Sequence, residues 1–351
     1  MKTRRHTAHR WLFSLLLAAL TGCVEQMVVP EPDPQYGDMP LVFSASPMNV
    51  MTVATKAGNF PNDTPNSPLD DNNCRITVFG YRSLDNDLLF DYEEVKRANG
   101  KWTYTPLQYW RHSGDYKFMA VYGPTLDHNT CSYSAAQNRL VATYRMHGDD
   151  FDLMVADAQR LDLSTDYLHK TDTVDLHFKH ACAAVRFLFR KGLDAGDNDY
   201  YLHSFELQKV QTVGTFIYDA GSTVTASSWY VAEYLDPRVL VWNAASPAEN
   251  KEVPDSYANY LSAYAATTAR WHYVIPQQIS DKTAAINFSV LVNENNDDTV
   301  PVYTTLELPA ITWEPGKVYT YYIQIQPGTA DITVTAIPWD EYDVATDDII
   351  F

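Results

Sequence analysis

The chain has 351 residues, and its 44 acidic side chains outnumber 26 Lys and Arg, giving a formal net charge of −18 at pH 7. A field of this sign repels nucleic acid and anionic lipid, so neither is an expected partner. Aromatic residues reach 13 % of the chain, which together with many short apolar runs favours β-sheet. The length predicts two domains.

The first 40 residues have the organisation of a lipoprotein leader followed by a tether. Four Lys or Arg side chains precede an apolar run at residues 11–22, which has the length of a signal-peptide core and is too short to span a bilayer. The run ends on Leu20-Thr21-Gly22-Cys23, the order of a bacterial lipobox. We therefore predict residues 1–22 as a signal peptide, Cys23 as the lipidated residue and residues 23–40, rich in proline and acidic side chains, as an extended tether.

Short β-branched or aromatic segments bounded by Asn, Asp, Pro or Gly follow the tether. In the first half of the chain they predict strands at 41–46, 75–81, 116–122 and 152–156. A long polar segment at 55–73, with three prolines, predicts an exposed loop.

The second half repeats this style after a polar connection at 161–172. Strands are predicted at 174–179, 184–190, 201–209, 215–218, 271–275, 285–292, 300–308, 317–326 and 331–338. Only residues 255–268 favour a short helix, and 180–184 a single helical turn. Strands at this spacing without alternating long helices predict an all-β chain of antiparallel sandwiches, with an N-terminal domain at 41–170 and a C-terminal domain at 171–351.

Six short motifs occur in a fixed order after the lipobox. They are Phe79-Gly-Tyr81, Trp102–Trp110, Tyr116–Tyr122, Asp152–Ala156, Leu176–Phe187 and Trp313–Ile323. Over roughly residues 41–340 this order and spacing resembles the fimbrillin-like lipoproteins. The resemblance implies two transthyretin-like β-sandwich domains in tandem, joined near residue 170. It also implies a subunit of a type V pilus in the stalk, tip or anchor position, with other pilus subunits as partners and a lipid-anchored place on the cell outer membrane.

The resemblance further implies maturation by a trypsin-like protease that removes the first strand. The first basic residue after Cys23 is Lys56, and the predicted strand 41–46 lies upstream of it. In that strand Leu41 and Phe43 share one face while Val42 lies on the other. A neighbour's C-terminal strand would then fill the opened groove by β-strand addition.

The candidate donor strand is the C-terminal segment 342–351. It ends on Ile349, Ile350 and Phe351, although two aspartates at 347 and 348 make it a poor strand.

The aromatic residues around Pro106 have two readings. Trp102, Tyr104, Tyr109 and Trp110 either pack in a core or stack on sugars. The second reading gives the alternative function of a monomeric surface lipoprotein that binds glycans, and a host or glycan ligand is compatible with both functions.

The remaining candidates for chemistry favour structural roles. His177 and His180 fall on opposite faces of a strand, so packing or hydrogen bonding is favoured over a metal site. The acidic run at 293–298 lacks the spacing of a calcium loop. Cys74, Cys131 and Cys182 allow at most one disulfide, and Cys182 lies in an apolar stretch that favours an inert buried thiol. No catalytic or nucleotide motif is present, so we predict neither enzymatic activity nor a cofactor or metal.

Overall fold

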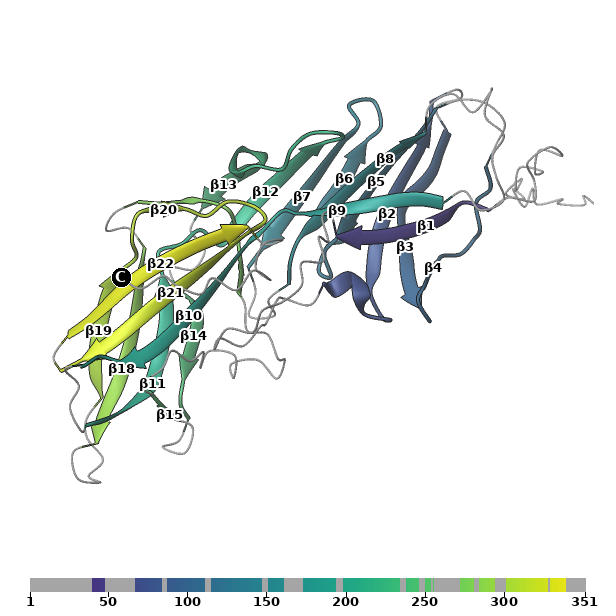
Figure 1. Ribbon diagram of the computed structural model, residues 1–351. Helices are drawn as coiled ribbons and strands as arrows, with labels where there is room; N and C mark the ends of the chain where they lie inside the picture. Colours follow the sequence, from purple (N-terminus) through teal and green to yellow (C-terminus); the bar gives the residue numbers. More distant parts are fainter. Residues whose placement is uncertain are drawn as a thin grey trace, which may run out of the picture.

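The protein is all β in the part of the chain that the structure describes. The computed structural model describes residues 40–47, 67–83, 87–110, 115–146, 151–160, 173–193, 198–233, 238–245, 250–253, 255, 272–280, 284–293, 301–327 and 329–338. These ranges contain strands and two short 3₁₀ helices, η1 (Pro68–Asp70) and η3 (Ala226–Ser228), and no α-helix (Figure 1). The predicted fold class is confirmed.

The N-terminal sheet has seven strands in the order β1-β9-β8-β5-β2-β3-β4. Their bounds are β1 Val42–Pro47, β9 Thr173–His180, β8 Met154–Arg160, β5 Tyr116–Tyr122, β2 Arg75–Arg82, β3 Asp87–Ala98 and β4 Lys101–Thr103. A second, four-stranded sheet, here called the middle sheet, has the order β13-β12-β7-β6. Its strands are β13 Trp229–Glu233, β12 Val213–Asp219, β7 Arg139–Arg145 and β6 Cys131–Ser134.

Two further sheets form the C-terminal sandwich. One has the order β16-β10-β21-β22, and the other β14-β11-β18-β19 with β15 paired to β11. Their bounds are β16 His272–Val274, β10 Ala183–Lys191, β21 Lys317–Gln326, β22 Thr329–Pro338, β14 Arg238–Asn243, β11 Asp199–Gln208, β18 Ala285–Asn293, β19 Val302–Glu307 and β15 Lys251–Glu252. A small ladder joins β17 (Gln278–Ile279) to β20 (Ile311–Thr312).

The N-terminal sheet is curled, so that its first strand meets the chain that follows its last strand. The amide of Leu41 donates to the carbonyl of Gln108 over 2.8 Å, and Pro40 forms an antiparallel bridge with Tyr109. The concave face encloses a core to which alternate residues of each strand contribute, including Phe43, Val78, Phe90, Phe118, Met154 and Leu176. Gly80 is required here, because a Cβ at this position would lie 2.4 Å from the ring of Phe90.

The convex face of the N-terminal sheet packs on the middle sheet. Met119 and Val155 from the first sheet join Tyr144, Phe216 and Trp229 in one buried cluster. The N-terminal sheet is therefore buried on both faces over much of its area, which explains why β5 reads as a nearly continuous apolar run rather than an alternation.

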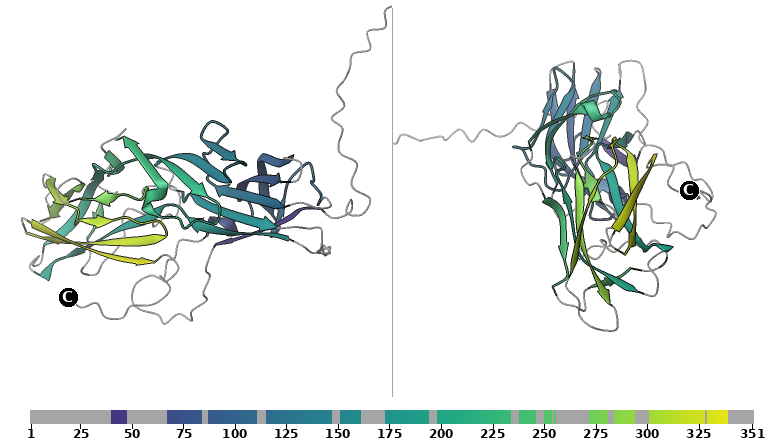
Figure 2. Two further views of the ribbon diagram at one scale, coloured as in Figure 1. Left: turned by 90° about the horizontal axis from the view of Figure 1, so that it is seen from above. Right: turned by 90° about the vertical axis from the view of Figure 1, so that its left-hand side faces the viewer.

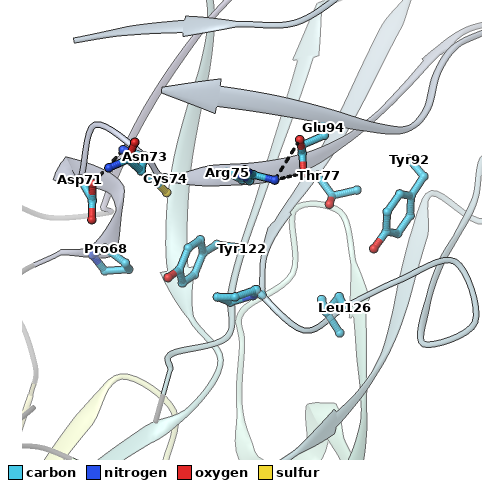
Figure 3. A pocket seen from close by; sticks show the side chains of 12 residues that line it. Pro68, Asp71, Asn73, Cys74, Arg75, Thr77, Tyr92, Glu94, Tyr122 and Leu126 are labelled. Atoms are coloured by element: carbon cyan, nitrogen blue, oxygen red, sulfur yellow. Dashed lines mark hydrogen bonds and ion pairs between the residues drawn. The ribbon is translucent and has the colours of Figure 1, made fainter. Parts of the chain in front are cut away.

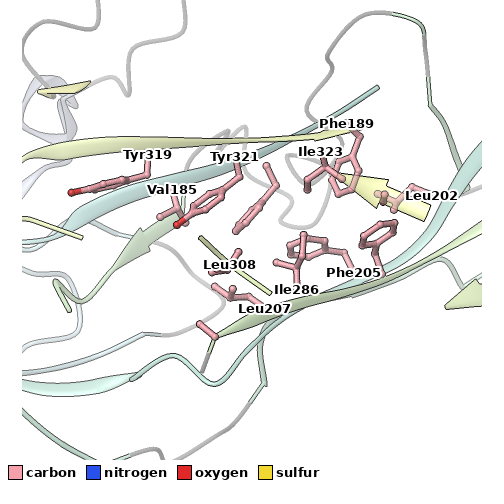
Figure 4. Close-up of a cluster of buried hydrophobic side chains, with 14 of the residues drawn as sticks. Val185, Phe189, Leu202, Phe205, Leu207, Ile286, Leu308, Tyr319, Tyr321 and Ile323 are labelled. Atoms are coloured by element: carbon pink, nitrogen blue, oxygen red, sulfur yellow. The ribbon is translucent and has the colours of Figure 1, made fainter. Parts of the chain in front are cut away.

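The C-terminal sandwich has its own core between its two sheets. Figure 4 shows Tyr321 and Ile323 of one sheet facing Phe205 and Leu207 of the other. Trp313 is fully buried beside them, and its indole N–H donates to the hydroxyl of Tyr321 over 2.8 Å. The polar atoms of two large aromatic side chains thus satisfy each other inside the core.

One almost continuous stretch of chain joins the two ends of the elongated molecule (Figure 2). β9 belongs to the N-terminal sheet and β10 to the C-terminal sandwich, and only Ala181 and Cys182 separate them. Both linking residues are buried, and the carbonyl of Ala181 accepts from the Trp229 indole at 2.8 Å. The helical turn predicted at 180–184 is wrong, because the chain bends at Cys182 and continues as a strand.

The sheets do not divide at the predicted domain boundary. β9 lies beyond residue 170 and pairs with β1 and β8, and β12 lies beyond it and pairs with β7. The division into domains 41–170 and 171–351 therefore stays a prediction about folding units, while strand pairing crosses it. The antiparallel pattern also has two parallel exceptions, β1 with β9 and β10 with β21.

Most predicted strands are present within a few residues of their predicted bounds, and those at 116–122 and 317–326 coincide with β5 and β21. The strands that were not predicted are β3, β4, β6, β7, β13, β14, β15, β17 and β20. Residues 256–268 of the predicted helix, the whole polar connection 161–172 and residues 294–298 of the acidic run 293–298 lie outside the described residues.

Candidate functional site

β1 is the candidate functional element, because this strand forms one edge of the N-terminal sheet and yet has a buried, apolar inner face. Leu41 and Phe43 are 1 % and 3 % exposed, whereas Val42 between them is 42 % exposed. This alternation follows from the period of two in a strand and confirms the predicted faces. An edge strand has a neighbouring strand on one side of its backbone only. Burial of its apolar inner face is therefore an important part of what holds it in place.

β1 runs parallel to β9 in a register of six residue pairs, from Val42 opposite Thr173 to Pro47 opposite Phe178. On the outer face the hydroxyl of Ser44 donates to the carboxylate of Asp175, and Ser46 lies 3.2 Å from Nδ1 of His177. These are exposed hydrogen bonds between short side chains. They align the two strands but add little stability in water.

The start of β1 is also held from its other side. The hydroxyl of Tyr104 donates to the carbonyl of Leu41 over 2.7 Å, and the Leu41 amide donates to Gln108. Burial raises the pKa of Tyr104 to about 12, so its hydroxyl stays protonated and available as the donor. The segment after β4 therefore closes the curled sheet against β1.

Phe43 anchors β1 in the core. Its ring makes edge-to-face contacts with Phe90, Tyr104 and Phe118 at centroid distances of 5.4, 5.6 and 5.9 Å. Burial of a side chain of this size stabilises a fold by about 1.5–3 kcal/mol, and aromatic pairs add about 0.5–1.5 kcal/mol. Removal of β1 would leave a hydrophobic groove lined by these three rings.

β9 pairs with β8 only near its end, although Val174, Leu176 and Phe178 along the strand are buried. It pairs with β8 through two residue pairs, Met154 with His180 and Val155 with Lys179. The Lys179 ammonium donates to the Tyr218 hydroxyl over 2.6 Å, and Tyr218 donates to Asp157. Among the described pairings, residues 173–178 of β9 pair with β1 alone. The β1–β9 ribbon thus covers the opening of the curled sheet.

The other predicted site residues cannot be placed relative to this edge. Cys23, Lys56, Ile349, Ile350 and Phe351 are outside the described residues, so their roles stay predictions. From the sequence we did not predict that β9 is the partner of β1, or that Tyr104 holds the start of β1 by a hydrogen bond. The only available signal for the second was the aromatic cluster around Pro106, of which Tyr104 and Trp110 are buried while Tyr109 is 37 % exposed.

His180, Asp152 and Cys182 come together at the bend between β9 and β10, but their environment opposes catalysis. His180 Nδ1 is hydrogen-bonded to the Asp152 carboxylate, which is 2 % exposed. Burial raises the pKa of Asp152 and raises that of the fully buried Cys182 thiol well above its ordinary value. A thiol without solvent access that stays protonated is a poor nucleophile.

The structure also places the other polar candidates, His177 and the three cysteines. His177 is exposed beside Ser46, so it lies apart from His180. Cys74, Cys131 and Cys182 are all buried and unpaired. Within the described ranges, no group of three or more His, Cys, Asp or Glu side chains could hold a metal ion, and no helix is long and apolar enough to cross a membrane.

Comparisons with solved structures show the same fold elsewhere. A fimbrial protein from Bacteroides vulgatus superposes with a TM-score of 0.55 at 13 % identity, covering 75 % of this chain and 92 % of that one. A C-terminally truncated tip fimbrial protein from Porphyromonas gingivalis gives a TM-score of 0.35 at 10 % identity, covering 77 % and 95 %. At such identities the first likeness shows the fold alone, and the second is too distant to add to it.

Sequence comparison identifies the family directly. No curated protein matches the chain. The sequence profile of the fimbrillin-like family matches residues 63–339, well over half of the chain. The chain therefore belongs to the fimbrillin-like family, which supports a role as a fimbrial subunit or adhesin at the cell surface.

Proposed function

We propose that this protein is a lipid-anchored pilus subunit that assembles by exchange of its first strand. The observation that carries the proposal is the position of β1, an edge strand whose Phe43, together with Leu41 directly before the strand, covers an aromatic core. Family membership supports the fimbrial role, and the strand geometry supports the exchange.

The proposed maturation step is cleavage after Lys56. After cleavage, β1 would be held to the rest of the protein by its pairing with β9, by the hydrogen bonds of Leu41 with Tyr104 and Gln108, and by its buried side chains. Departure of β1 would leave the backbone groups of residues 173–178 of β9 and the carbonyl of Gln108 without their present partners. Unpaired strand edges beside an open hydrophobic groove favour pairing with another chain.

The incoming strand must reproduce what β1 supplies. It needs two large apolar residues separated by one outward-facing residue, as in Leu41-Val42-Phe43. Ile349-Ile350-Phe351 of another copy has this spacing, and a different pilus subunit could offer an equivalent segment. The donor assignment is therefore part of the proposal.

Anchoring and the absence of catalysis complete the proposed function. Cys23 would carry the lipid, hold the precursor at the outer membrane and leave residues 24–40 as a tether. We assign no enzymatic role and no cofactor, because the known family role is structural or adhesive and the bend at His180 offers no accessible nucleophile.

N-terminal sequencing of the protein recovered from surface filaments tests the maturation step. We expect assembled material to begin at Ala57, and Lys56→Ala to abolish both this start and polymer. Lys56→Arg is the matched control, because it keeps a site for a trypsin-like protease and should behave as wild type. Filaments composed of chains that begin at Cys23 would contradict the proposal.

A further inference from the structure

A cavity of about 460 Å³ opens on the N-terminal sheet beside η1 and the start of β2. Figure 3 shows that its walls come from the start of β2, from β3, from the end of β5 and from the turns on either side of these strands. Its volume lies in the range of small-molecule sites. No residue of β1 or β9 lines it.

One wall of the cavity is formed by Tyr92, whose side chain is directed towards the cavity by an irregularity in the backbone of β3. Tyr92 has a φ of 59°, in the left-handed region that non-glycine residues rarely adopt. The β2–β3 register shifts between Val78 and Gly80, so two residues of β3, one of them Tyr92, lie opposite Phe79. Such bulges re-aim a side chain, and here the Tyr92 ring packs on His128 with centroids 4.0 Å apart.

A second tyrosine lies between the two ends of the cavity (Figure 3). Tyr122 is half-buried at the end of β5, and burial, together with the charges of Cys74, Asp152 and Asp71, raises its pKa. Its hydroxyl therefore stays protonated and can donate a hydrogen bond. Tyr122 and Asp71 both line the cavity, so the ring and the carboxylate border the same space.

The charged groups of the cavity largely compensate one another. Arg75 Nη1 lies 3.2 Å from Glu94 Oε2, and the other oxygen of Glu94 lies 2.8 Å from Lys96 Nζ. Asp71 accepts the amide of Asn73 over 2.7 Å, which fixes its carboxylate at the rim. The cavity thus presents several donors and acceptors with little excess charge, an arrangement suited to a neutral ligand with many hydroxyl groups rather than to a phosphate or sulfate.

We propose that this cavity binds a neutral hexose unit of a glycan, with a C–H face of the sugar against the tyrosine rings and its hydroxyls on Asp71 and the Arg75–Glu94 pair. Flat aromatic rings beside fixed polar side chains match the two kinds of surface that a pyranose offers. The inference rests on the adhesin role that family membership supports, and it requires no strand exchange.

Binding of methyl glucoside, methyl galactoside and N-acetylglucosamine to the full chain carrying Cys23→Ser tests the inference by saturation-transfer NMR and calorimetry. We expect saturable binding of at least one of these sugars below 20 mM, in the weak range usual for small ligands. Tyr122→Ala and Asp71→Asn should each weaken it about tenfold, a loss of about 1.4 kcal/mol. Sodium sulfate, as an anionic probe, should not compete.

Two matched controls lie outside the cavity. Asp70→Asn changes the neighbouring carboxylate, which pairs with Arg97, and Tyr303→Ala removes a tyrosine that is 76 % exposed on β19. Both should stay within twofold of wild type. Should Tyr122→Ala unfold the protein, Tyr122→Phe and Asp71→Asn carry the test.

Three results would overturn the inference: no binding of any of the three sugars at 20 mM, equal binding by the cavity variants and wild type, or displacement by sulfate. Each leaves the filament assay with Lys56→Ala untouched, because that assay reads assembly and this one reads sugar binding by the unassembled chain. Failure of the cavity proposal and failure of the pilus proposal are therefore distinguishable.

Discussion

The two parallel strand pairs of this protein have the same type of hydrogen-bond ladder, but one lies at the edge of a sheet and the other in the interior of a sheet. β1 pairs with β9 over six residue pairs at the edge of a sheet, and its outer residues are exposed. β10 pairs with β21 over eight residue pairs in the interior of a sheet and also pairs with β16. Seven consecutive residues of β10, from Ala183 to Phe189, are buried.

The contrast shows that the kind of pairing does not decide which strand can be exchanged. β10 has neighbours on both sides and buried faces above and below, so it cannot leave without unfolding the sandwich. β1 has one neighbouring strand, one buried face, and a hydrogen bond from Tyr104 to Leu41 that holds its start. Exchange needs a strand that is held by a few strong contacts whose loss leaves the rest of the sheet intact.

The largest effect is expected from a truncation in the C-terminal sandwich. Phe187 is fully buried and stacks on Tyr321 with centroids 5.1 Å apart. We expect Phe187→Ala to lower the free energy of unfolding by about 3–5 kcal/mol, because it opens a cavity in a core that cannot collapse. Urea unfolding followed by circular dichroism measures this loss, with Tyr303→Ala on the exposed face of β19 as a control that should change little.

Truncation of the anchor of β1 should give a smaller and more local effect. We expect Phe43→Ala to cost about 3 kcal/mol, the lower end of the range for buried phenylalanine, because an edge strand can shift towards the space. Hydrogen exchange should show faster exchange of the amides of residues 173–178 in β9, with those of β10 and β21 unchanged. Val42→Ala, on the exposed side of the same strand, is the matched control.

Equal loss of protection in β9 and β10 in Phe43→Ala would contradict the comparison. It would mean that β1 and the C-terminal sandwich unfold as one cooperative unit, which leaves no local opening for a donor strand.

The smallest effect is expected from an ion pair on the surface of the middle sheet. Arg139 and Asp219 face each other on β7 and β12, with Nε and Oδ1 2.6 Å apart, and both side chains are more than a third exposed. Solvent screening limits such pairs to about 0.2–1 kcal/mol, so Asp219→Asn should destabilise by no more than that at pH 7.

The same pair predicts a pH dependence. The hydrogen bond and charge of Arg139 hold the pKa of Asp219 below its ordinary 3.8. The stabilisation is therefore present above pH 3.8 and disappears as the pH falls through the lower pKa of the folded state. Urea unfolding of wild type and Asp219→Asn at pH 7 and pH 3 should give a difference that shrinks at the lower pH. A difference that grows there would contradict this reading.

Local patterns were enough to place most strands and to orient the first one. The runs at 116–122 and 317–326 are apolar enough to be recognised without their partners, and the alternation of Leu41, Val42 and Phe43 gives the buried face of β1. β3 was missed because Asp91, Glu93 and Glu94 interrupt its apolar pattern, and the backbone irregularity at Tyr92 breaks its alternation.

The sequence by itself determined the all-β class and the burial of Phe43. These features depend on the properties of a few adjacent residues: side-chain period and apolar content. Only the tertiary structure decided that β1 pairs with β9, that Tyr104 clamps it and that Asp71, Tyr92 and Tyr122 line one cavity. β1 and β9 lie far apart in the chain. Ser44 and Asp175, which form a hydrogen bond between these two strands, are separated by 131 residues. Contacts of this kind arise from the curling of a whole sheet, and no local pattern of residues encodes which distant segment will close it.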